Sequence, residues 1–287
     1  MPSAGGGPHS GLIVDSHHHF WDPSVRTYPW MGAALDPIRR PFGPDDLEPL
    51  ARASDVGRTV LVQTVSSILE TQQFLSVAAT HELVGGVVGW IDLTDPGVAG
   101  RLAELRAGVG GSKLCGVRHQ VHDEADPDWL RRDDVQRGLF AIKEAGLAYD
   151  LLVRTRELPA AHDAARRHPD LRFVIDHAAK PRIADGPRDT EWELAMAPMA
   201  ALPNVTCKLS GLVTEAGWKA WTQEQLEPYI ARVLDWFGPK RCMFGSDWPV
   251  CLLAASYEEV VATIRKVAGD DEDVFAGTAM RVYGLTS

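Results

Sequence analysis

Long apolar runs, basic clusters and paired cysteine motifs are all missing from this sequence of 287 residues. No stretch approaches the roughly eighteen continuous apolar residues of a membrane-spanning helix, so no membrane partner is expected. Acidic residues outnumber basic ones by 39 to 29, which gives a net charge of −10, and no run of lysine and arginine could neutralise a row of phosphates. Nucleic acid is therefore not an expected partner either.

Cysteine is scarce, and its placement argues against disulfides. The four cysteines, at positions 115, 207, 242 and 251, form no C-x-x-C pair, and the first three lie in apolar, strand-like runs. A reduced cysteine in such a run behaves as a small hydrophobe. Residues 1–11 carry neither part of an export signal and are expected to be a flexible segment, so the sequence predicts a cytoplasmic protein.

Short apolar runs alternate eight times with segments of helical periodicity, in a chain that is 45% hydrophobic and 24% charged. The runs have the continuous apolar character of strands buried on both faces. Strands are expected at 12–16, 59–63, 86–92, 114–119, 147–153, 172–177, 204–210 and 241–247, with helices near 44–56, 70–81, 97–108, 133–145, 157–168, 190–202, 223–237 and 256–267. This alternation predicts one (β/α)8 TIM barrel over residues 12–287, an architecture that takes roughly 250 residues or more.

Polar side chains stand at the carboxyl ends of these expected strands, which meet at the active-site mouth of a barrel. The longest irregular segments, 20–43, 122–132 and 180–189, directly follow strands and are expected to line that mouth. Side chains expected to converge there are His17, His19, Gln63, Trp90, Asp92, Arg118, His119, Asp150, His177, Lys208, Ser210 and Asp247.

The first strand ends in three histidines. Residues two apart on a strand point to the same side, so His17 and His19 are expected to share a face from which His18 turns away. Two imidazoles on one face can hold one cation, since histidine is the commonest ligand of borderline metals. A solvated loop is the alternative interpretation.

Asp247 and His177 are the other candidates for the centre of the site. A carboxylate at the end of the eighth strand could orient and deprotonate an attacking water, and an aspartate that caps a turn is the alternative. His177 is a third candidate metal ligand or an electrophilic donor, with a hydrogen-bonded core histidine as its alternative.

Arg118 and His119 offer a fixed cation and another imidazole, suited to polarising a carbonyl or binding a carboxylate. For Arg118, a structural ion pair explains the sequence equally well. Flat aromatic faces suit a sugar-like ring, although core packing also accounts for the tryptophans. Predicted substrate contacts are Trp21, Trp30, Gln63, Trp90, Asp92, Asp150, Lys180 and Trp248.

Four motifs in this order carry a resemblance to a known family: Val-Asp-Ser-His-His-His-Phe-Trp-Asp at 14–22, Gly-Val-Arg-His at 116–119, Asp-His-Ala-Ala-Lys-Pro at 176–181 and Gly-Ser-Asp-Trp-Pro at 245–249. From residue 12 to about 284 the chain resembles the amidohydrolase superfamily. The similarity is to its sugar-lactonase branch, which includes L-fuconolactonases, L-rhamnonolactonases and 2-pyrone-4,6-dicarboxylate lactonases.

The resemblance implies a hydrolase that opens an aldonolactone such as L-fucono-1,5-lactone by attack of water on the ring carbonyl. Asp247 would be the general base, and His17, His19, His177 and Asp247 the metal ligands. For this reaction, Arg118, His119 and any bound metal are the candidate groups to stabilise the oxyanion. The superfamily pattern places a bridging lysine or glutamate on strand four and a metal histidine on strand five. Here those strands end in Arg118-His119 and Tyr149-Asp150, so one divalent ion, first of all zinc, or none is expected.

Two other functions fit the same sequence. One is a mono-zinc enzyme that decarboxylates an aromatic or enoic acid without oxidation, and the other is a barrel that binds a ligand without catalysis. The sequence is compatible with a homo-oligomer.

Overall fold

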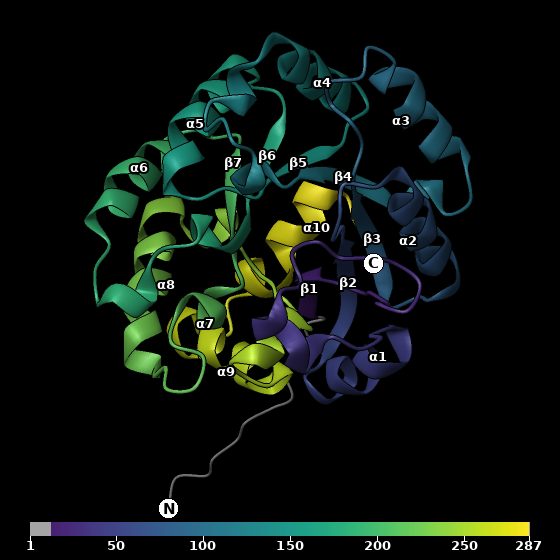
Figure 1. Ribbon diagram of the computed structural model, residues 1–287. Coiled ribbons are helices and arrows are strands. Elements are labelled where there is room, and N and C mark those ends of the chain that lie inside the picture. The colour runs from purple at the N-terminus through teal and green to yellow at the C-terminus, as the bar shows by residue number, and fades with distance from the viewer. Residues whose placement is uncertain (1–12, 287) are drawn as a thin grey trace, which may run out of the picture.

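The computed structural model describes residues 13–286, so the flexible segment expected at 1–11 lies outside the described residues. Eight strands form one sheet in chain order, each parallel to the next. The predicted barrel is confirmed, and Figure 1 shows the strands enclosed by a ring of helices. The strands are β1 (Ile13–His18), β2 (Val56–Val62), β3 (Val84–Gly89), β4 (Leu114–His119), β5 (Ala148–Leu151), β6 (Arg172–Ile175), β7 (Val205–Leu209) and β8 (Cys242–Phe244).

All eight expected helices are present, with bounds that differ from the expected ones by a few residues. They are α1 (Pro44–Ala53), α2 (Ile68–Thr80), α3 (Val98–Ala107), α4 (Asp133–Glu144), α5 (Leu158–Arg167), α6 (Thr190–Ala200), α8 (Gln223–Phe237) and α9 (Tyr257–Ala268). The structure adds two short α-helices that the sequence does not predict, α7 (Leu212–Glu215) and α10 (Thr278–Tyr283). They carry too few residues for helical periodicity to be recognised.

The barrel closes where the segment after β8 meets β1. The Asp247 backbone N–H donates to the His17 carbonyl at 2.8 Å. The buried Asp15 carboxylate accepts hydrogen bonds from the Ser246 amide at 2.8 Å, the Ser246 hydroxyl at 2.6 Å and the Tyr257 hydroxyl at 3.0 Å. Closure of the barrel therefore brings Asp247 beside His17.

Helix α10 fills the end of the barrel that lies opposite to the polar strand ends. Tyr283 lies beside Gly116, and Leu285 lies beside Gly86, both in the first halves of their strands. In Figure 1, α10 is seen in the middle of the ring of strands. It packs on an apolar layer from the strand interiors that includes Val14, Val60, Val62, Val88, Ala148, Val174 and Met243.

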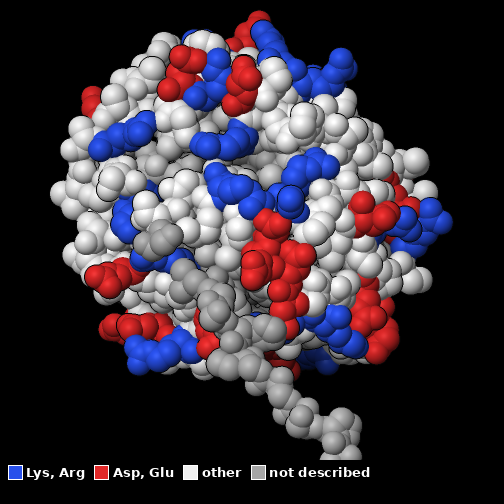
Figure 2. Space-filling view, turned by 180° about the vertical axis from the view of Figure 1, so that it is seen from behind, with Lys and Arg blue, Asp and Glu red and all other residues white. Residues whose placement is uncertain are grey.

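The molecular surface carries charges of both signs. Figure 2 shows the face turned away in Figure 1, where lysine and arginine side chains are interspersed with aspartate and glutamate. Among residues 13–286, none of the helices combines the length and the apolarity needed to cross a bilayer.

Candidate active site

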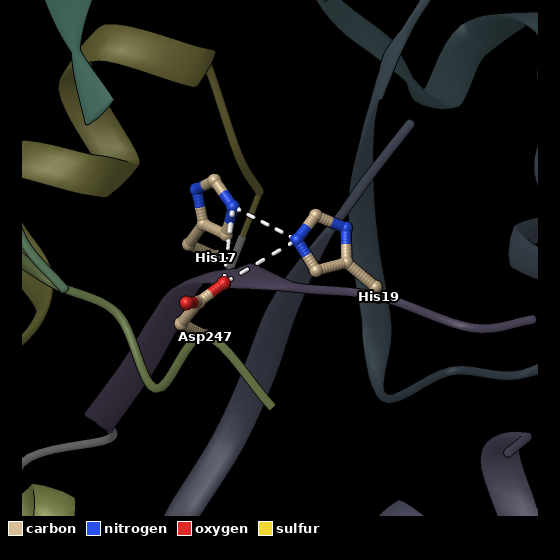
Figure 3. A group of neighbouring side chains, drawn as sticks. All are labelled: His17, His19 and Asp247. Carbon is tan, nitrogen blue, oxygen red and sulfur yellow. Dashed lines mark hydrogen bonds and ion pairs between the residues drawn. The ribbon is translucent and has the colours of Figure 1, made fainter. Parts of the chain in front are cut away.

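β1 carries two histidines on one side, and Figure 3 shows their rings close together. The Nε2 atoms of His17 and His19 are 3.1 Å apart. His18 has a different partner, because its Nε2 lies 2.8 Å from Thr59 Oγ1. His19 Nδ1 lies 2.8 Å from the Val62 carbonyl oxygen, to which it donates, so its Nε2 presents a lone pair to the site.

A left-handed backbone conformation positions His177 and Asp247 in the centre of the site. Residues 177–180 all have φ between 49° and 58°, and Asp247 has φ of 57°. The backbone therefore leaves the extended conformation early, so β6 ends at Ile175 and β8 at Phe244, before the expected ends at 177 and 247. Such conformations cost of order 1–3 kcal/mol per non-glycine residue and are concentrated at functional sites.

Gly211, directly after β7, allows His177 to approach Asp247. A Cβ atom at this position would lie 2.5 Å from His177 Nδ1 and 3.1 Å from Asp247 Oδ2. The neighbouring Ser210 hydroxyl lies 2.9 Å from His177 Nδ1 and fixes the ring. Any larger residue at 211 would displace the imidazole.

Asp247 is surrounded by the three imidazoles, and Figure 3 shows two of them. Its Oδ1 lies 3.4 Å from His19 Nε2, 3.8 Å from His17 Nε2 and 3.9 Å from His177 Nε2. None of the four side chains is more than 7% exposed. The structure thus brings together the four residues predicted as metal ligands, from β1 and from the segments that follow β6 and β8.

These atoms have the spacing and chemistry of a site for one metal ion. Ligands around a tetrahedral zinc ion, with bonds of about 2.1 Å, lie roughly 3.4 Å from one another. His17 Nδ1 lies 3.3 Å from the Asp176 carboxylate and 3.1 Å from Lys208 Nζ. Donation to Asp176 leaves the lone pair on His17 Nε2, which is the carboxylate–histidine arrangement typical of metal sites, and Arg118 Nη1 lies 3.3 Å from this lone pair. The residues therefore fit a single divalent ion.

Burial sets the charges in the centre of the site. It lowers the pKa of His177 to about 4 and the pKa of His17 well below 6.5. Burial acts to raise the pKa of Asp247, but His177 and His19 outweigh it, and the pKa lies below its usual 3.8. At neutral pH His17 and His177 are therefore neutral and Asp247 is ionised, the forms required of metal ligands and of a general base.

Acid is expected to destabilise the fold because of these buried imidazoles. Burial lowers the pKa of His18 to about 3 and that of His177 to about 4, from 6.5 in the unfolded chain. Below pH 6.5 the unfolded chain binds more protons, so the free energy of unfolding falls with pH until the folded-state pKa is reached. Each of the two rings should contribute a loss of about 2 kcal/mol at pH 5.

Thermal unfolding of the metal-free protein at pH 7.5 and pH 5.0 tests this expectation. The Tm should be lower at pH 5.0, and the difference should be smaller in a His18→Gln variant, whose side chain does not titrate. Equal Tm values at the two pH values in the unmodified protein would show that the buried rings are not held neutral.

Next to His17 lies a buried ion network formed by Arg118, Asp150, Asp176 and Lys208. Lys208 Nζ lies 2.6 Å from Asp150 Oδ2 and 3.0 Å from Asp176 Oδ1. Arg118 Nη1 donates to Asp176 Oδ2 at 2.8 Å. Burial acts to lower the pKa of Lys208, but Asp150 and Asp176 raise it overall, so the ammonium stays charged. Burial raises the pKa of Asp150 to about 6.

Arg118 is bound by the protein on all sides of its guanidinium. Nη2 donates to the Gln63 carbonyl at 2.5 Å and to Gln63 Oε1 at 2.9 Å, and Nε donates to the same Oε1 at 3.2 Å. Of the two interpretations open from the sequence, this geometry favours the structural ion pair. The predicted substrate contacts of Gln63 and Asp150 stay predictions, since both side chains are buried in the network.

His119 has partners at both ring nitrogens. Trp90 Nε1 donates to His119 Nδ1 at 3.0 Å, so His119 Nε2 carries the proton and donates to Glu124 Oε1 at 2.8 Å. The ring stacks on Trp129 with centroids 4.3 Å apart. Among residues 13–286, no hydrogen bond or ion pair joins His119 to the central group, and its catalytic role stays a prediction.

Two other predicted substrate contacts lie on segments that follow strands. Lys180 pairs with Glu215 of α7 at 2.8 Å, and both side chains are partly exposed. Asp92 is exposed and accepts hydrogen bonds from the Thr94 amide at 2.9 Å and hydroxyl at 2.7 Å, which makes a local turn. Lys180 thus has a charged partner from another element, whereas the Asp92 contacts are local.

The remaining tryptophans mostly contact other aromatic side chains. Trp21 and Trp248 are almost fully buried, and both pack edge to face against Phe42. Trp30 packs against Trp21 and donates from Nε1 to the Thr64 carbonyl at 2.9 Å. Core packing accounts for these contacts, and binding of a substrate ring by the tryptophans stays a prediction.

Four buried polar residues near the site have no specific role predicted from the sequence, although Lys208 is expected to converge on the site: Asp15, Asp176, Lys208 and Tyr283. Asp15, Asp176 and Lys208 are visible as single charges inside or directly after apolar runs, and a buried charge needs a partner. The Tyr283 hydroxyl donates to Asp150 Oδ2 at 2.8 Å, a contact between α10 and β5 that no local pattern reveals.

Comparison with known proteins places this geometry in a family context. The amidohydrolase family model matches residues 14–285. An L-fucono-1,5-lactonase from Burkholderia multivorans is 42% identical over 96% of both chains. An L-fucono-1,5-lactonase from Burkholderia ambifaria is 42% identical over 95% of both chains.

A solved amidohydrolase structure has the same fold as this chain. The crystal structure of an amidohydrolase from Burkholderia multivorans with bound zinc has a TM-score of 0.91 and 41% identity. The alignment covers 96% of this chain and 100% of that chain.

Proposed function

The chain belongs to the amidohydrolase family, and we propose that it is a lactonase that hydrolyses an aldonolactone, with L-fucono-1,5-lactone as the first candidate substrate. The observation that carries the proposal is the buried, ionised Asp247 carboxylate among the imidazoles of His17, His19 and His177. The names of the two relatives at 42% identity support the choice of substrate. The proposal includes a cytoplasmic location and a role in carbohydrate metabolism.

Asp247 acts as general base and then as general acid. Its carboxylate takes a proton from the attacking water as the water oxygen bonds to the ring carbonyl carbon. When the tetrahedral intermediate collapses, the bond between that carbon and the ring oxygen breaks. Protonated Asp247 returns its proton to the ring oxygen, and the product is the open hydroxy acid.

His177 can donate a hydrogen bond to the developing oxyanion. The Ser210 hydroxyl, 2.9 Å from His177 Nδ1, can donate to this nitrogen, and His177 then carries its proton on Nε2, beside Asp247. Arg118 contributes differently, because its N–H groups are already bound by Gln63 and Asp176. It holds the Asp176 carboxylate that faces His17.

A divalent ion fits between His17, His19 and Asp247, and zinc is the proposed identity. His177 would join these ligands only in its other tautomer, with the proton on Nδ1. When bound, such an ion would supply Lewis acidity to the substrate carbonyl or to the attacking water.

A panel of freshly prepared aldonolactones tests the function. We expect the protein to open L-fucono-, L-galactono- or L-rhamnonolactone faster than the spontaneous rate, with release of acid followed by a pH indicator. Zinc-loaded protein should hydrolyse the lactone faster than chelated protein. The chelated protein should retain part of the activity, because a lactone is an activated ester and Asp247 remains in place as the base.

The outcome of this panel also decides between functions. A protein that opens no lactone, yet releases carbon dioxide from an aromatic acid and loses this activity on chelation, would be a decarboxylase with the same ligands. A protein inactive in both assays would be a binding barrel.

A further inference from the structure

Two overlapping groups of side chains in this barrel have the composition of a metal site. His17, His19 and Asp247 form the first group, and His17, Asp176 and His177 form the second. Within each group the candidate ligand atoms lie within 4.8 Å of one another, and all of the residues are buried. Composition and spacing alone would therefore allow two ions that share His17.

A protein cation already lies against the second group. Lys208 Nζ is 3.0 Å from Asp176 Oδ1 and 3.1 Å from His17 Nδ1. The Lys208 side chain is fully buried, and Asp150 holds its ammonium at 2.6 Å. In the first group, Arg118 Nη1 lies 3.3 Å from His17 Nε2, but Asp247, the carboxylate of this group, has only imidazoles within 4 Å among the described ion pairs.

The balance of charge around the two groups also favours an ion at the first group. In the buried ion network, the two cations Lys208 and Arg118 balance the two carboxylates of Asp150 and Asp176. A divalent ion at the second group would lie close to the ammonium, and like charges at such short distances repel strongly in a buried environment. Asp247 has no lysine or arginine among its described ion-pair partners, so its negative charge favours a cation at the first group.

We propose that the Lys208 ammonium acts as a built-in cation of the second group and thereby limits the barrel to one divalent ion, held by the first group. The inference builds on the metal site of the proposed function, but it concerns the number of ions and not the reaction. Lys208 is in this sense a positioning residue, because it holds Asp176 and His17 without contacting the substrate.

Removal of the lysine side chain should open a second metal site formed by Asp176 and His17 of the second group together with Asp150. In Lys208→Ala, the freed Asp150, Asp176 and His17 atoms would all surround the position that the ammonium leaves. Asp150 Oδ1, which has no hydrogen-bond partner among the described residues, adds another donor. Two carboxylates and one imidazole suit a divalent ion.

Zinc stoichiometry, measured by native mass spectrometry and elemental analysis after dialysis, tests the inference without an activity assay. We expect one zinc per chain in the unmodified protein and two in Lys208→Ala. Propylammonium, which replaces the deleted part of the lysine, should compete with the second zinc and return the number to one. Tyr283→Phe is the matched control, since it removes a hydrogen bond from Asp150 but keeps the ammonium, and should bind one zinc.

Each result has a defined meaning. Two zinc ions in the unmodified protein, or equal numbers in the unmodified protein and folded Lys208→Ala, would overturn the inference. No zinc in the unmodified protein but one in Lys208→Ala would show that Lys208 blocks the second site, but it would overturn the single ion at the first group and the metal of the proposed function. If Lys208→Ala does not fold, Lys208→Gln, which is neutral and bulkier, is measured and interpreted in the same way.

Discussion

Replacement of Asp247 with asparagine is expected to lower kcat on the best lactone by about 10²–10⁴-fold, the usual contribution of a general base. The amide has the shape of the carboxylate but cannot take the proton of the attacking water. Asparagine also tolerates the left-handed backbone at this position, where φ is 57°. The variant should therefore fold and keep its Tm within a few degrees while turnover is lost.

The measurement is initial lactone hydrolysis, corrected for the spontaneous rate, with circular dichroism as the check on folding. Asp163→Asn is a matched control, because Asp163 is exposed on α5 and pairs with Arg131 at the surface. Its kcat should equal that of the unmodified protein. If Asp247→Asn retained more than about a tenth of the activity, Asp247 would not be the general base.

The sequence predicts the fold and the composition of the central site because both depend on local periodicity. Alternating runs give the barrel, and parallel strands bring their carboxyl ends to one side. The two-residue spacing of His17 and His19 on one strand is enough to predict that they share a face. His177 and Asp247 join them because of their place at the ends of the sixth and eighth strands.

The details that escape prediction depend on long-range contacts and on backbone conformation. The left-handed turn at residues 177–180 contains no glycine that would indicate it in the sequence. The sequence therefore predicts a sixth strand that continues to 177. The pairing of Lys208 with Asp150 and Asp176 joins three different segments, and strand order alone does not give side-chain direction inside a barrel. Tyr283 reaches this network from a helix six residues long that periodicity cannot identify.

Arg118 shows how the structure decides between two interpretations that the sequence leaves equal. A guanidinium that binds substrate must have free N–H groups directed into the site. In the structure Arg118 is 3% exposed, and its nitrogens are hydrogen-bonded to Gln63 and Asp176. The expected consequence of its removal is therefore first a loss of stability, and a loss of activity only as His17 and Asp176 lose their positions.

Arg118→Ala is expected to lower the free energy of unfolding by about 3–5 kcal/mol, as is usual when one partner of a buried ion pair is deleted. The buried ion network would keep two carboxylates but only one cation, and Gln63 would lose its hydrogen-bond donors. Denaturant unfolding at pH 7.5 measures this loss. Arg52→Ala is the control, because Arg52 is 79% exposed and forms only a surface pair with Glu48.

The control should change the free energy of unfolding by no more than about 0.5 kcal/mol, since exposed ion pairs contribute little. The decisive comparison is between stability and catalysis in the same Arg118→Ala preparation. If unfolding is unchanged while kcat/KM falls by orders of magnitude, Arg118 contacts the substrate or the transition state directly. If both fall, and Arg118→Lys recovers stability because it restores a cation beside Asp176, the arginine acts through the network that holds His17.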